Sequence, residues 1–307
     1  MADRSTIGII GAGRAAHVLG IALARAGYEI VAVASRTQAS AESAASAIND
    51  AGQQGGVGAC VVTSAQGAAD AADLVLITTN DGAIAEVAGQ VNWKPGQAVV
   101  HVSGALGADV LAPAAAGGAR IASWHPFQTL AGSARLDGVT FGIEADDDLY
   151  GELAEMANAV GGEPLLVPSE ARALYHAASV LACGYLTTLL REARRVWEAA
   201  GLPEEAGRRA IGAVAAATLE NVRSLGEGAT VTGPVSRGDV GTVRLHLEEI
   251  DRVAPELIPL YTSISRRSAV LATEAGRPTG PLDTWDALYG EFLEPAIGSL
   301  TVDVDKD

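Results

Sequence analysis

The sequence predicts an α/β domain built on a parallel β-sheet, followed by an all-helical domain. In the first half of the chain, short apolar segments with strand character alternate with helical patterns. A glycine-rich turn joins the first strand to the first helix, and the chain from residue 169 onward carries helical patterns alone. Strands that alternate with helices form right-handed units in which helices cover both faces of a parallel sheet. We therefore expect domains at residues 1–167 and 168–307.

The elements of the first domain follow from apolar runs and their boundaries. We expect strands at residues 6–10, 29–34, 59–62, 74–78, 98–102, 120–123, 139–143 and 163–167. We expect helices at residues 15–26, 39–50, 84–91, 108–115 and 147–160.

The second domain is predicted from helical periodicity and helix-end signals. A long helical stretch at residues 169–200 is stopped by Gly201. Pro203 then occupies a first helical position, with Glu204 in the first turn, where the helix dipole favours a carboxylate. Apolar residues at spacings of three or four continue that helix, and two further helices are expected at residues 242–253 and 255–275. Residues 281–297 are expected to pack on the protein.

The charge balance excludes several classes of function. The chain of 307 residues has 21 basic and 37 acidic residues, a formal net charge of −16. Such a field repels phosphate backbones, so we expect no nucleic-acid partner and no anionic membrane surface. The only lysines are Lys94 and Lys306, so the chain lacks a Gly-Lys-Ser/Thr phosphate loop and has almost no candidate for a catalytic lysine.

The location predicted from the sequence is cytoplasmic. The N-terminal residues run straight into the first strand, which predicts no signal peptide, and we see no uninterrupted apolar run of about 18 residues. Cys60 and Cys183 fit neither a metal-ligand spacing nor a disulfide framework, so no metal site is expected. With 49% hydrophobic residues, the chain has enough apolar material for a buried core.

The glycine-rich turn has the pattern G-x-G-x-x-A between a strand and a helix. Gly11 permits the tight turn, Gly13 lets a pyrophosphate approach the backbone, and Ala16 allows close helix–strand packing. In this context the motif predicts a Rossmann-type dinucleotide site, with phosphates at the helix N-terminus. The expected binding residues are Gly11, Ala12, Gly13, Arg14 and Ala15. The alternative is a glycine-rich turn in an α/β protein that binds no nucleotide.

The end of the second strand distinguishes between the two nicotinamide cofactors. An NAD site usually carries Asp or Glu there for the ribose 2′-hydroxyl, whereas this chain has Ser35, Arg36 and Thr37. A guanidinium and two hydroxyls suit a 2′-phosphate, which favours NADP. The alternative is a solvated surface arginine.

Two further strand ends are expected to line the cofactor groove. One carries Thr78, Thr79 and Asn80, and the other continues from His101 to Ser103. Ligands of parallel sheets bind beyond the carboxyl ends of the strands. The alternative for the first group is a helix cap.

Hydride transfer to a C=O or C=N bond needs a proton donor near the reacting heteroatom. Because lysine is scarce, the candidates are His125, in a Trp-His-Pro-Phe segment, and His176, near the start of the long helix. A Thr-, Gly- and Pro-rich loop at residues 230–239 contributes Arg237, which could anchor a carboxylate, and Asp239, which could orient a donor. The alternative for each histidine is a hydrogen-bonded structural residue.

Together these motifs resemble a bacterial family of two-domain oxidoreductases. The resemblance covers roughly residues 5–275. The resembling segments are the G-x-G-x-x-A turn, His-Val-Ser-Gly, Trp-His-Pro-Phe-Gln, Tyr-His-Ala-Ala and Thr-Gly-Pro-Val-Ser-Arg-Gly-Asp-Val-Gly-Thr. That family pairs a Rossmann-like domain with a helical domain of unknown function. It is similar in plan to pyrroline-5-carboxylate reductase, 6-phosphogluconate dehydrogenase and ketopantoate reductase. The resemblance implies an NADP-binding domain, a helical domain that forms a homodimer, and a substrate cleft.

The chain departs from these relatives in two respects. Cys183 and Gly184 stand where the relatives lead us to expect a polar Ser-Asn pair. The long helix also lacks the lysine that ketopantoate reductases and the phosphogluconate enzymes use. The resemblance therefore transfers the plan of the family and neither of these two activities.

The leading hypothesis is an NADPH-dependent reductase of a small carbonyl compound, such as a 2-oxo acid, or of an imine. His176 or His125 would donate or relay the proton, Arg237 would bind an anionic group of the substrate, and Ser103 would lie near the nicotinamide. The alternative is a non-catalytic NADP-binding sensor or partner-binding protein, which Gly184 in place of a polar residue favours.

Overall fold

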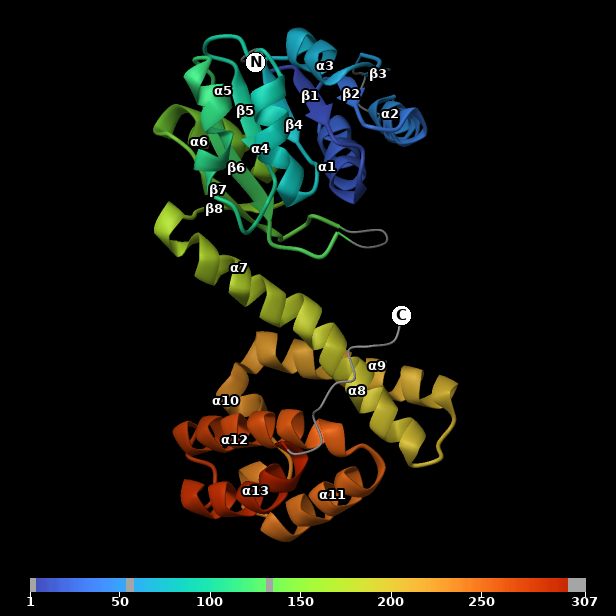
Figure 1. Ribbon diagram of the computed structural model, residues 1–307, viewed down its shortest axis with the longest axis vertical. Coiled ribbons are helices and arrows are strands. Elements are labelled where there is room, and N and C mark those ends of the chain that lie inside the picture. Colours follow the sequence, from blue (N-terminus) through green and yellow to red (C-terminus); the bar gives the residue numbers. More distant parts are fainter. Residues whose placement is uncertain (1–3, 54–57, 131–134, 298–307) are drawn as a thin grey trace. The chain divides into compact units, whose positions relative to one another are not determined.

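The computed structural model describes residues 4–53, 58–130 and 135–297. The chain divides into two compact units, Met1–Gly184 and Tyr185–Asp307 (Figure 1). The first is an α/β unit and the second is helical, as predicted.

The first unit is built on a single sheet with the strand order β3-β2-β1-β4-β5-β6-β7-β8. The strands are β1 (Ile7–Ile10), β2 (Ile30–Ala34), β3 (Val61–Val62), β4 (Leu74–Ile77), β5 (Ala98–His101), β6 (Arg120–Pro126), β7 (Thr140–Glu144) and β8 (Glu163–Leu166). All neighbouring pairs are parallel except β6 and β7. The predicted parallel sheet is therefore confirmed, with β6 and β7 as the one antiparallel pair among the described strands. The described residues between β6 and β7, 127–130 and 135–139, form no helix, and a parallel pairing usually needs a crossover helix.

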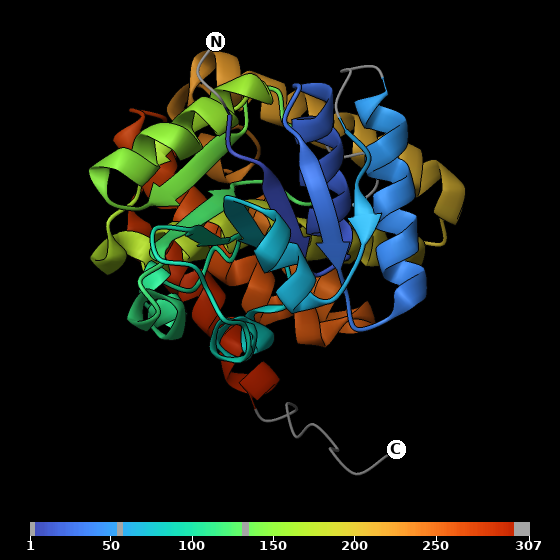
Figure 2. The same ribbon diagram turned by 90° about the horizontal axis from the view of Figure 1, so that it is seen from above.

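Helices cover both faces of the sheet (Figure 2). They are α1 (Arg14–Arg25), α2 (Gln38–Gly52), α3 (Ala65–Ala71), α4 (Asp81–Gln90), α5 (Ala112–Ala116) with the preceding 3₁₀ turn η1 (Ala108–Leu111), and α6 (Asp147–Ala159). The sequence prediction missed α3, because a helix of seven residues is too short to show periodicity.

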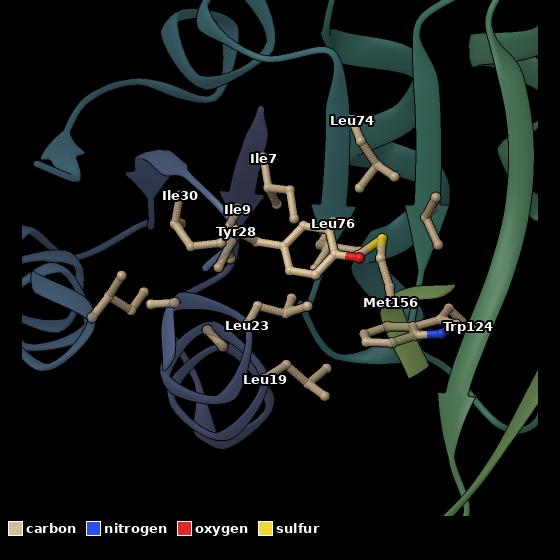
Figure 3. Close-up of a cluster of buried hydrophobic side chains, with 14 of the residues drawn as sticks. Ile7, Ile9, Leu19, Leu23, Tyr28, Ile30, Leu74, Leu76, Trp124 and Met156 are labelled. Carbon is tan, nitrogen blue, oxygen red and sulfur yellow. The ribbon is translucent and has the colours of Figure 1, made fainter. Parts of the chain in front are cut away.

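The alternation of side chains along β1 produces two hydrophobic cores. Ile7 and Ile9 point to one face, where they pack with residues of α1, α2 and α6, including Leu19 and Met156 (Figure 3). Ile10 belongs to the core of the other face, with residues of α3, α4 and α5. Burial on both faces explains why the central strands read as continuous apolar runs.

One continuous helical stretch, residues 169–199, crosses the boundary between the units. It consists of the turn η2 (Ser169–Ala171), α7 (Arg172–Val180), a π-helical turn η3 (Leu181–Tyr185) and α8 (Leu186–Ala199). The first compact unit extends beyond the predicted boundary at residue 167 to Gly184. The reason is that α7 contacts the sheet, for example through Arg172 and Glu144 of β7.

This helix is also the one described segment, Ser169–Ala199, that is long and apolar enough to cross a membrane, by length and composition only. Its best 18-residue window has a mean hydropathy of 1.4, and none of that window is buried. The expectation of no apolar run overlooked it, because Ala, Gly and Thr interrupt the larger apolar residues. An exposed apolar surface of this kind needs a cover, either lipid or protein.

The second unit is a bundle around its own core. Its further helices are α9 (Glu204–Leu225), α10 (Glu227–Thr230), η4 (Val235–Arg237), α11 (Val240–Val253), η5 (Pro255–Leu257), α12 (Ile258–Glu274) and α13 (Leu282–Ile297). The fully buried Trp285 of α13 packs in a core with residues of α11 and α12. A hydrogen bond of 2.6 Å between the hydroxyls of Ser265 and Tyr289 adds a polar contact between α12 and α13.

We expect Gly20→Val to destabilise the first unit. A Cβ atom at Gly20 of α1 would lie 2.6 Å from Cδ1 of Ile48 in α2, and both helices are packed there. Overpacking of this kind costs roughly 1–3 kcal/mol of unfolding free energy, which urea denaturation measures. The matched control is Gly151→Val in α6, where a Cβ meets nothing within 4 Å. Equal effects of the two substitutions would contradict the packing argument.

Candidate functional site

A cleft of about 560 Å³ lies at the carboxyl ends of β1, β2 and β4. It is at the point where the strand order reverses between β1 and β4, the usual ligand position in open α/β sheets. Its lining includes most of the residues predicted to bind cofactor: Gly11, Ala12, Gly13, Ser35, Arg36, Thr37, Thr78, Thr79 and Asn80. Arg14 and Ala15, also predicted, lie in the first turn of α1 and are not part of the lining.

The glycine turn has the geometry that a phosphate group requires. Gly11 has φ +110°, and a Cβ there would lie 2.7 Å from the backbone nitrogen of Thr79. A Cβ at Gly13 would meet nothing within 4 Å, so the turn is open on that side. No side chain caps the N-terminus of α1, which leaves its first N–H groups available for an anion. These features fit a dinucleotide.

The polar residues of the cleft divide into structural and open positions. Thr78 donates a 2.6 Å hydrogen bond to the carbonyl of Gly11 and thereby holds the turn. The hydroxyl oxygen of Thr79 is buried and has no partner among the described residues. Asn80 precedes α4 without a side-chain cap bond, and the exposed Arg36 has no acidic neighbour at positions 35 or 37. Thr79, Asn80 and Arg36 are therefore the side chains of this group that remain available to a ligand.

A second group of polar residues lies at the same edge of the sheet, on β5, β6 and α7. Nδ1 of His125 lies 2.9 Å from the hydroxyl of Tyr175, and the rings of His125 and His176 have centroids 6.3 Å apart. His125 is inside β6, which continues beyond the predicted strand end at residue 123 because it pairs with β7. The two histidines selected from the sequence are therefore neighbours.

Both imidazoles pack over Gly104, in the turn that follows β5. A Cβ at Gly104 would lie 2.7 Å from Nε2 of His125 and 2.8 Å from Cδ2 of His176. Glycine is the residue that leaves room for both rings. The sequence motif His-Val-Ser-Gly contained this position, but only the structure shows why a glycine is needed there.

His101 and Ser103 shape that turn. Nδ1 of the fully buried His101 accepts a hydrogen bond from the backbone N–H of Ser103, and Nε2 lies 3.0 Å from the carbonyl of Gly107. The hydroxyl of Ser103 accepts hydrogen bonds from the N–H groups of Ala105 and Leu106, both at 3.2 Å. Ser103 therefore has a structural role beside any contact with a ligand.

Arg172 is the most unusual buried side chain of this group. It is 2% exposed, and its Nε donates a 3.2 Å hydrogen bond to Glu144. Its two terminal nitrogens are buried without a partner among the described residues. Its guanidinium carbon lies 5.9 Å from the ring centroid of Tyr175. A buried charge that is only partly paired acts strongly on its neighbours.

The environment shifts the proton affinities of this group. Burial, and then the charge of Arg172, lower the pKa of His125 to about 4. Burial is also the main cause that lowers the pKa of His101 to about 4. Burial raises the pKa of Tyr175 to about 12, although Arg172 and a hydrogen bond from the backbone of Gly142 oppose the change. At neutral pH His125 and His101 are therefore neutral, and Tyr175 retains its proton.

The two remaining candidates from the sequence, Arg237 and Asp239, belong to the second unit. Asp239 caps α11 by accepting hydrogen bonds from the N–H and hydroxyl of Thr242, and these bonds lower the pKa of Asp239. Arg237 is exposed in η4. Each unit by itself therefore brings together one part of the predicted set.

Sequence reasoning missed Arg172, Tyr175 and Glu144. Tyr175 precedes His176 and had a visible signal, because an aromatic hydroxyl next to a candidate histidine is a potential partner. Arg172 and Glu144 had none, since their pairing depends on how α7 meets β7. No group of three or more His, Cys, Asp or Glu side chains that could hold a metal ion occurs within residues 4–53, 58–130 and 135–297.

Comparisons with known families match two successive segments of the chain. Residues 1–126 match the Rossmann-like domain, and residues 139–268 match the domain of unknown function DUF2520. The boundary between the two matches lies inside the first compact unit, which extends to Gly184. The DUF2520 match begins at the start of β7, so it contains Arg172, Tyr175, His176 and Arg237, whereas His125 belongs to the Rossmann-like match.

Solved structures share the fold over most of the chain. A Bacteroides fragilis protein assigned as an NADP oxidoreductase is 25% identical, with a TM-score of 0.69 over 87% of this chain and 98% of that chain. An imine reductase from Pseudomonas sp. is 16% identical, with a TM-score of 0.63 over 93% and 99%. The 1-pyrroline-5-carboxylate reductase of Streptococcus pyogenes is 14% identical, with a TM-score of 0.61 over 89% and 98%. No curated protein matches the sequence.

Proposed function

We propose that the protein is an NADPH-dependent oxidoreductase that reduces a small carbonyl compound, such as a 2-oxo acid, or an imine by hydride transfer. The observation that carries the proposal is that the cleft and the histidine pair lie at one edge of one sheet. The cleft lies beyond β1, β2 and β4. His125 lies within β6, and His176 of α7 packs over Gly104 in the turn that follows β5. A dinucleotide that crosses the sheet from β2 toward β5 directs its nicotinamide half toward the histidines. The neighbours assigned as NADP oxidoreductase and imine reductase support the class of reaction.

The cofactor, when bound, supplies the hydride. The open glycine turn and the first N–H groups of α1 bind its phosphates, and Arg36 binds the 2′-phosphate. His125 and His176 contact the reacting heteroatom of the substrate and hold or move a proton there. The turn at Ser103 and Gly104 forms the floor beneath the reacting atoms.

A cytoplasmic location is part of the proposal. Cys60 is a buried free thiol, and burial raises its pKa to about 11. It therefore stays protonated and unreactive at neutral pH. Free thiols of this kind are typical of reducing compartments.

The second candidate function is a non-catalytic NADP-binding sensor or partner-binding protein. The observation that favours it is Gly184, in the π-helical turn, where related sequences lead us to expect a polar residue. A sensor needs the cleft but no proton donor.

The first experiment separates these candidates. We expect NADPH binding to quench tryptophan fluorescence. We also expect a panel of 2-oxo acids and cyclic imines to contain a substrate, whose turnover is measured as the loss of NADPH absorbance. His176→Gln should lower turnover by roughly 10²-fold and leave NADPH binding unchanged. The control is His246→Gln in α11, an exposed histidine of the second unit. NADPH binding without turnover of any compound would favour the sensor, and no binding at all would contradict both functions.

We expect Arg36→Ser to change the choice of cofactor. Loss of a charge-assisted contact with the 2′-phosphate should raise the Kd for NADPH about tenfold to a hundredfold and leave the Kd for NADH unchanged. Fluorescence titration with both cofactors measures the ratio. Arg25→Ser, at the C-terminal end of α1 and outside the lining of the cleft, is the control. An equal rise in the Kd for NADPH and for NADH would show that Arg36 does not bind the 2′-phosphate.

We also propose that the protein is a homodimer held by the apolar surface of α7, η3 and α8. Leu174, Leu181 and Tyr185 are exposed by 79%, 62% and 61%. Such a contiguous set of large apolar side chains is uncommon on a monomer.

Leu181→Glu should therefore shift the sedimentation coefficient from that of a dimer to that of a monomer. The control is Leu245→Glu in α11, because Leu245 is also 62% exposed. A wild-type chain that sediments as a monomer and binds phosphatidylcholine vesicles would contradict the dimer and assign the surface to lipid.

A further inference from the structure

We propose that Tyr175 and Arg172 hold His125 as a neutral imidazole with its proton on Nε2, so that His125 gives the substrate a hydrogen bond and keeps its own proton. The inference rests on the proposed function for the nature of the ligand. It rests on the first unit alone for the state of the imidazole. Tyr175 and Arg172 are positioning residues in this scheme, since they act through His125.

The contact with Tyr175 determines which ring nitrogen carries the proton. The Tyr175 hydroxyl has one proton to donate. Its oxygen lies 2.9 Å from Nδ1 of His125 and 3.4 Å from the backbone carbonyl oxygen of His125. The shorter contact is an ordinary hydrogen bond and the longer one is at the limit of the range. The backbone of Gly142 supplies a further hydrogen bond to the phenol. Tyr175 therefore donates to Nδ1, which leaves the imidazole proton on Nε2.

The position of the tyrosine is fixed by a second glycine. A Cβ at Gly142 of β7 would lie 2.5 Å from the Tyr175 hydroxyl, so the phenol rests directly on the backbone of the sheet. Phe127, whose ring centroid is 5.1 Å from that of Tyr175, packs against it. The hydroxyl thus has little freedom to leave Nδ1.

The charge of Arg172 opposes a second proton on the imidazole. Its guanidinium is buried and is paired once, with Glu144, which is 18% exposed. The titratable groups that surround His125 are His101 of β5, and Arg172, Tyr175 and His176 of α7. Each of these groups is neutral or cationic, and no carboxylate faces the ring in the described part of the unit. An imidazolium at this position would therefore have no neighbouring counterion in the described part of the unit.

The Nε2–H group faces the turn after β5. A Cβ at Gly104 would lie 2.7 Å from Nε2, so the bare glycine backbone packs beside this nitrogen. Nε2 makes no hydrogen bond with the described residues, so its N–H has no competing acceptor among them. A neutral N–H beside a developing negative charge stabilises that charge without a proton transfer.

This arrangement assigns different work to the two histidines. A reduced dinucleotide bound in the cleft would supply hydride to the carbon of C=O or C=N and would itself be oxidised, while the π electron pair would move to the heteroatom. His125 donates its hydrogen bond to that heteroatom. The proton that completes the product comes from solvent by way of His176, whose ring centroid lies 6.3 Å from that of His125.

The test is an NMR titration of the full chain labelled with ¹⁵N-histidine, without cofactor or substrate. Two-bond ¹H–¹⁵N correlations report which ring nitrogen is protonated, and His125→Gln identifies the signal. We expect His125 to show the Nε2–H form at pH 7 and to stay neutral down to pH 5, because its pKa is about 4. A folded-state pKa below that of the unfolded chain means that the neutral form is lost only when the pH falls through that low value.

Variants separate positioning from a merely structural role. Arg172→Met should raise the pKa of His125, although burial, the larger cause, keeps it below the ordinary value. Arg172→Lys keeps the charge and should keep the low pKa. Tyr175→Phe should populate both tautomers without changing the charge. These two variants keep the test decisive if Arg172→Met does not fold.

Three results would overturn the inference: an Nδ1–H form at neutral pH, a His125 that protonates between pH 6 and 7, or a pKa that Arg172→Met leaves unchanged. These readouts do not depend on NADPH. If NADPH binds and a substrate turns over while His125 is cationic, the inference fails and the proposed function stands. If His125 behaves as expected and NADPH does not bind, the proposed function fails.

Discussion

The parallel alignment of β1, β4, β5 and β6 is the constraint on which the functional part of the first unit depends. It brings the carboxyl ends of all four strands to one edge, so that every turn leaving the sheet faces the same side. The glycine turn after β1, the cleft beside it and the turn after β5 follow from that alignment. The single antiparallel pair, β6 with β7, then places Glu144 beside the start of α7. Without that reversal the buried arginine would have no counterion.

The cofactor residues of the candidate site could be predicted because they belong to local sequence motifs. The turn at Gly11 and Gly13 depends on residues within one strand–helix connection, so its sequence pattern is sufficient, and nine of the predicted cofactor residues line the observed cleft. Tyr175 and Arg172 depend instead on how a helix from the second half of the chain meets β7. That contact is set by tertiary packing and leaves no periodic or spacing signal. The same contact explains why the compact unit extends to Gly184, beyond the boundary expected where the strands end.

The net charge of the chain and the charges of single arginines act over different distances. A net charge of −16 disfavours anionic ligands at long range, whereas Arg36 lines the cleft and the buried Arg172 lies beside Glu144 and Tyr175. At short distances and in a buried setting, a single guanidinium outweighs a diffuse field that salt screens. The scarcity of lysine has a similar consequence, because the polar chemistry near the sheet edge depends on imidazole and phenol groups whose proton affinities are set by burial.

Two glycines, Gly104 and Gly142, support the histidine and tyrosine rings with bare backbone. This has a consequence for how mutational scans of the protein are interpreted. Alanine scanning treats alanine as the smallest neutral replacement, but at these two positions it adds a methyl group to a space that an aromatic ring already fills. Damage at such a position reports the insertion of an atom and not the loss of a contact. The sensitivity map of this region would therefore mark residues that have no side chain to contribute.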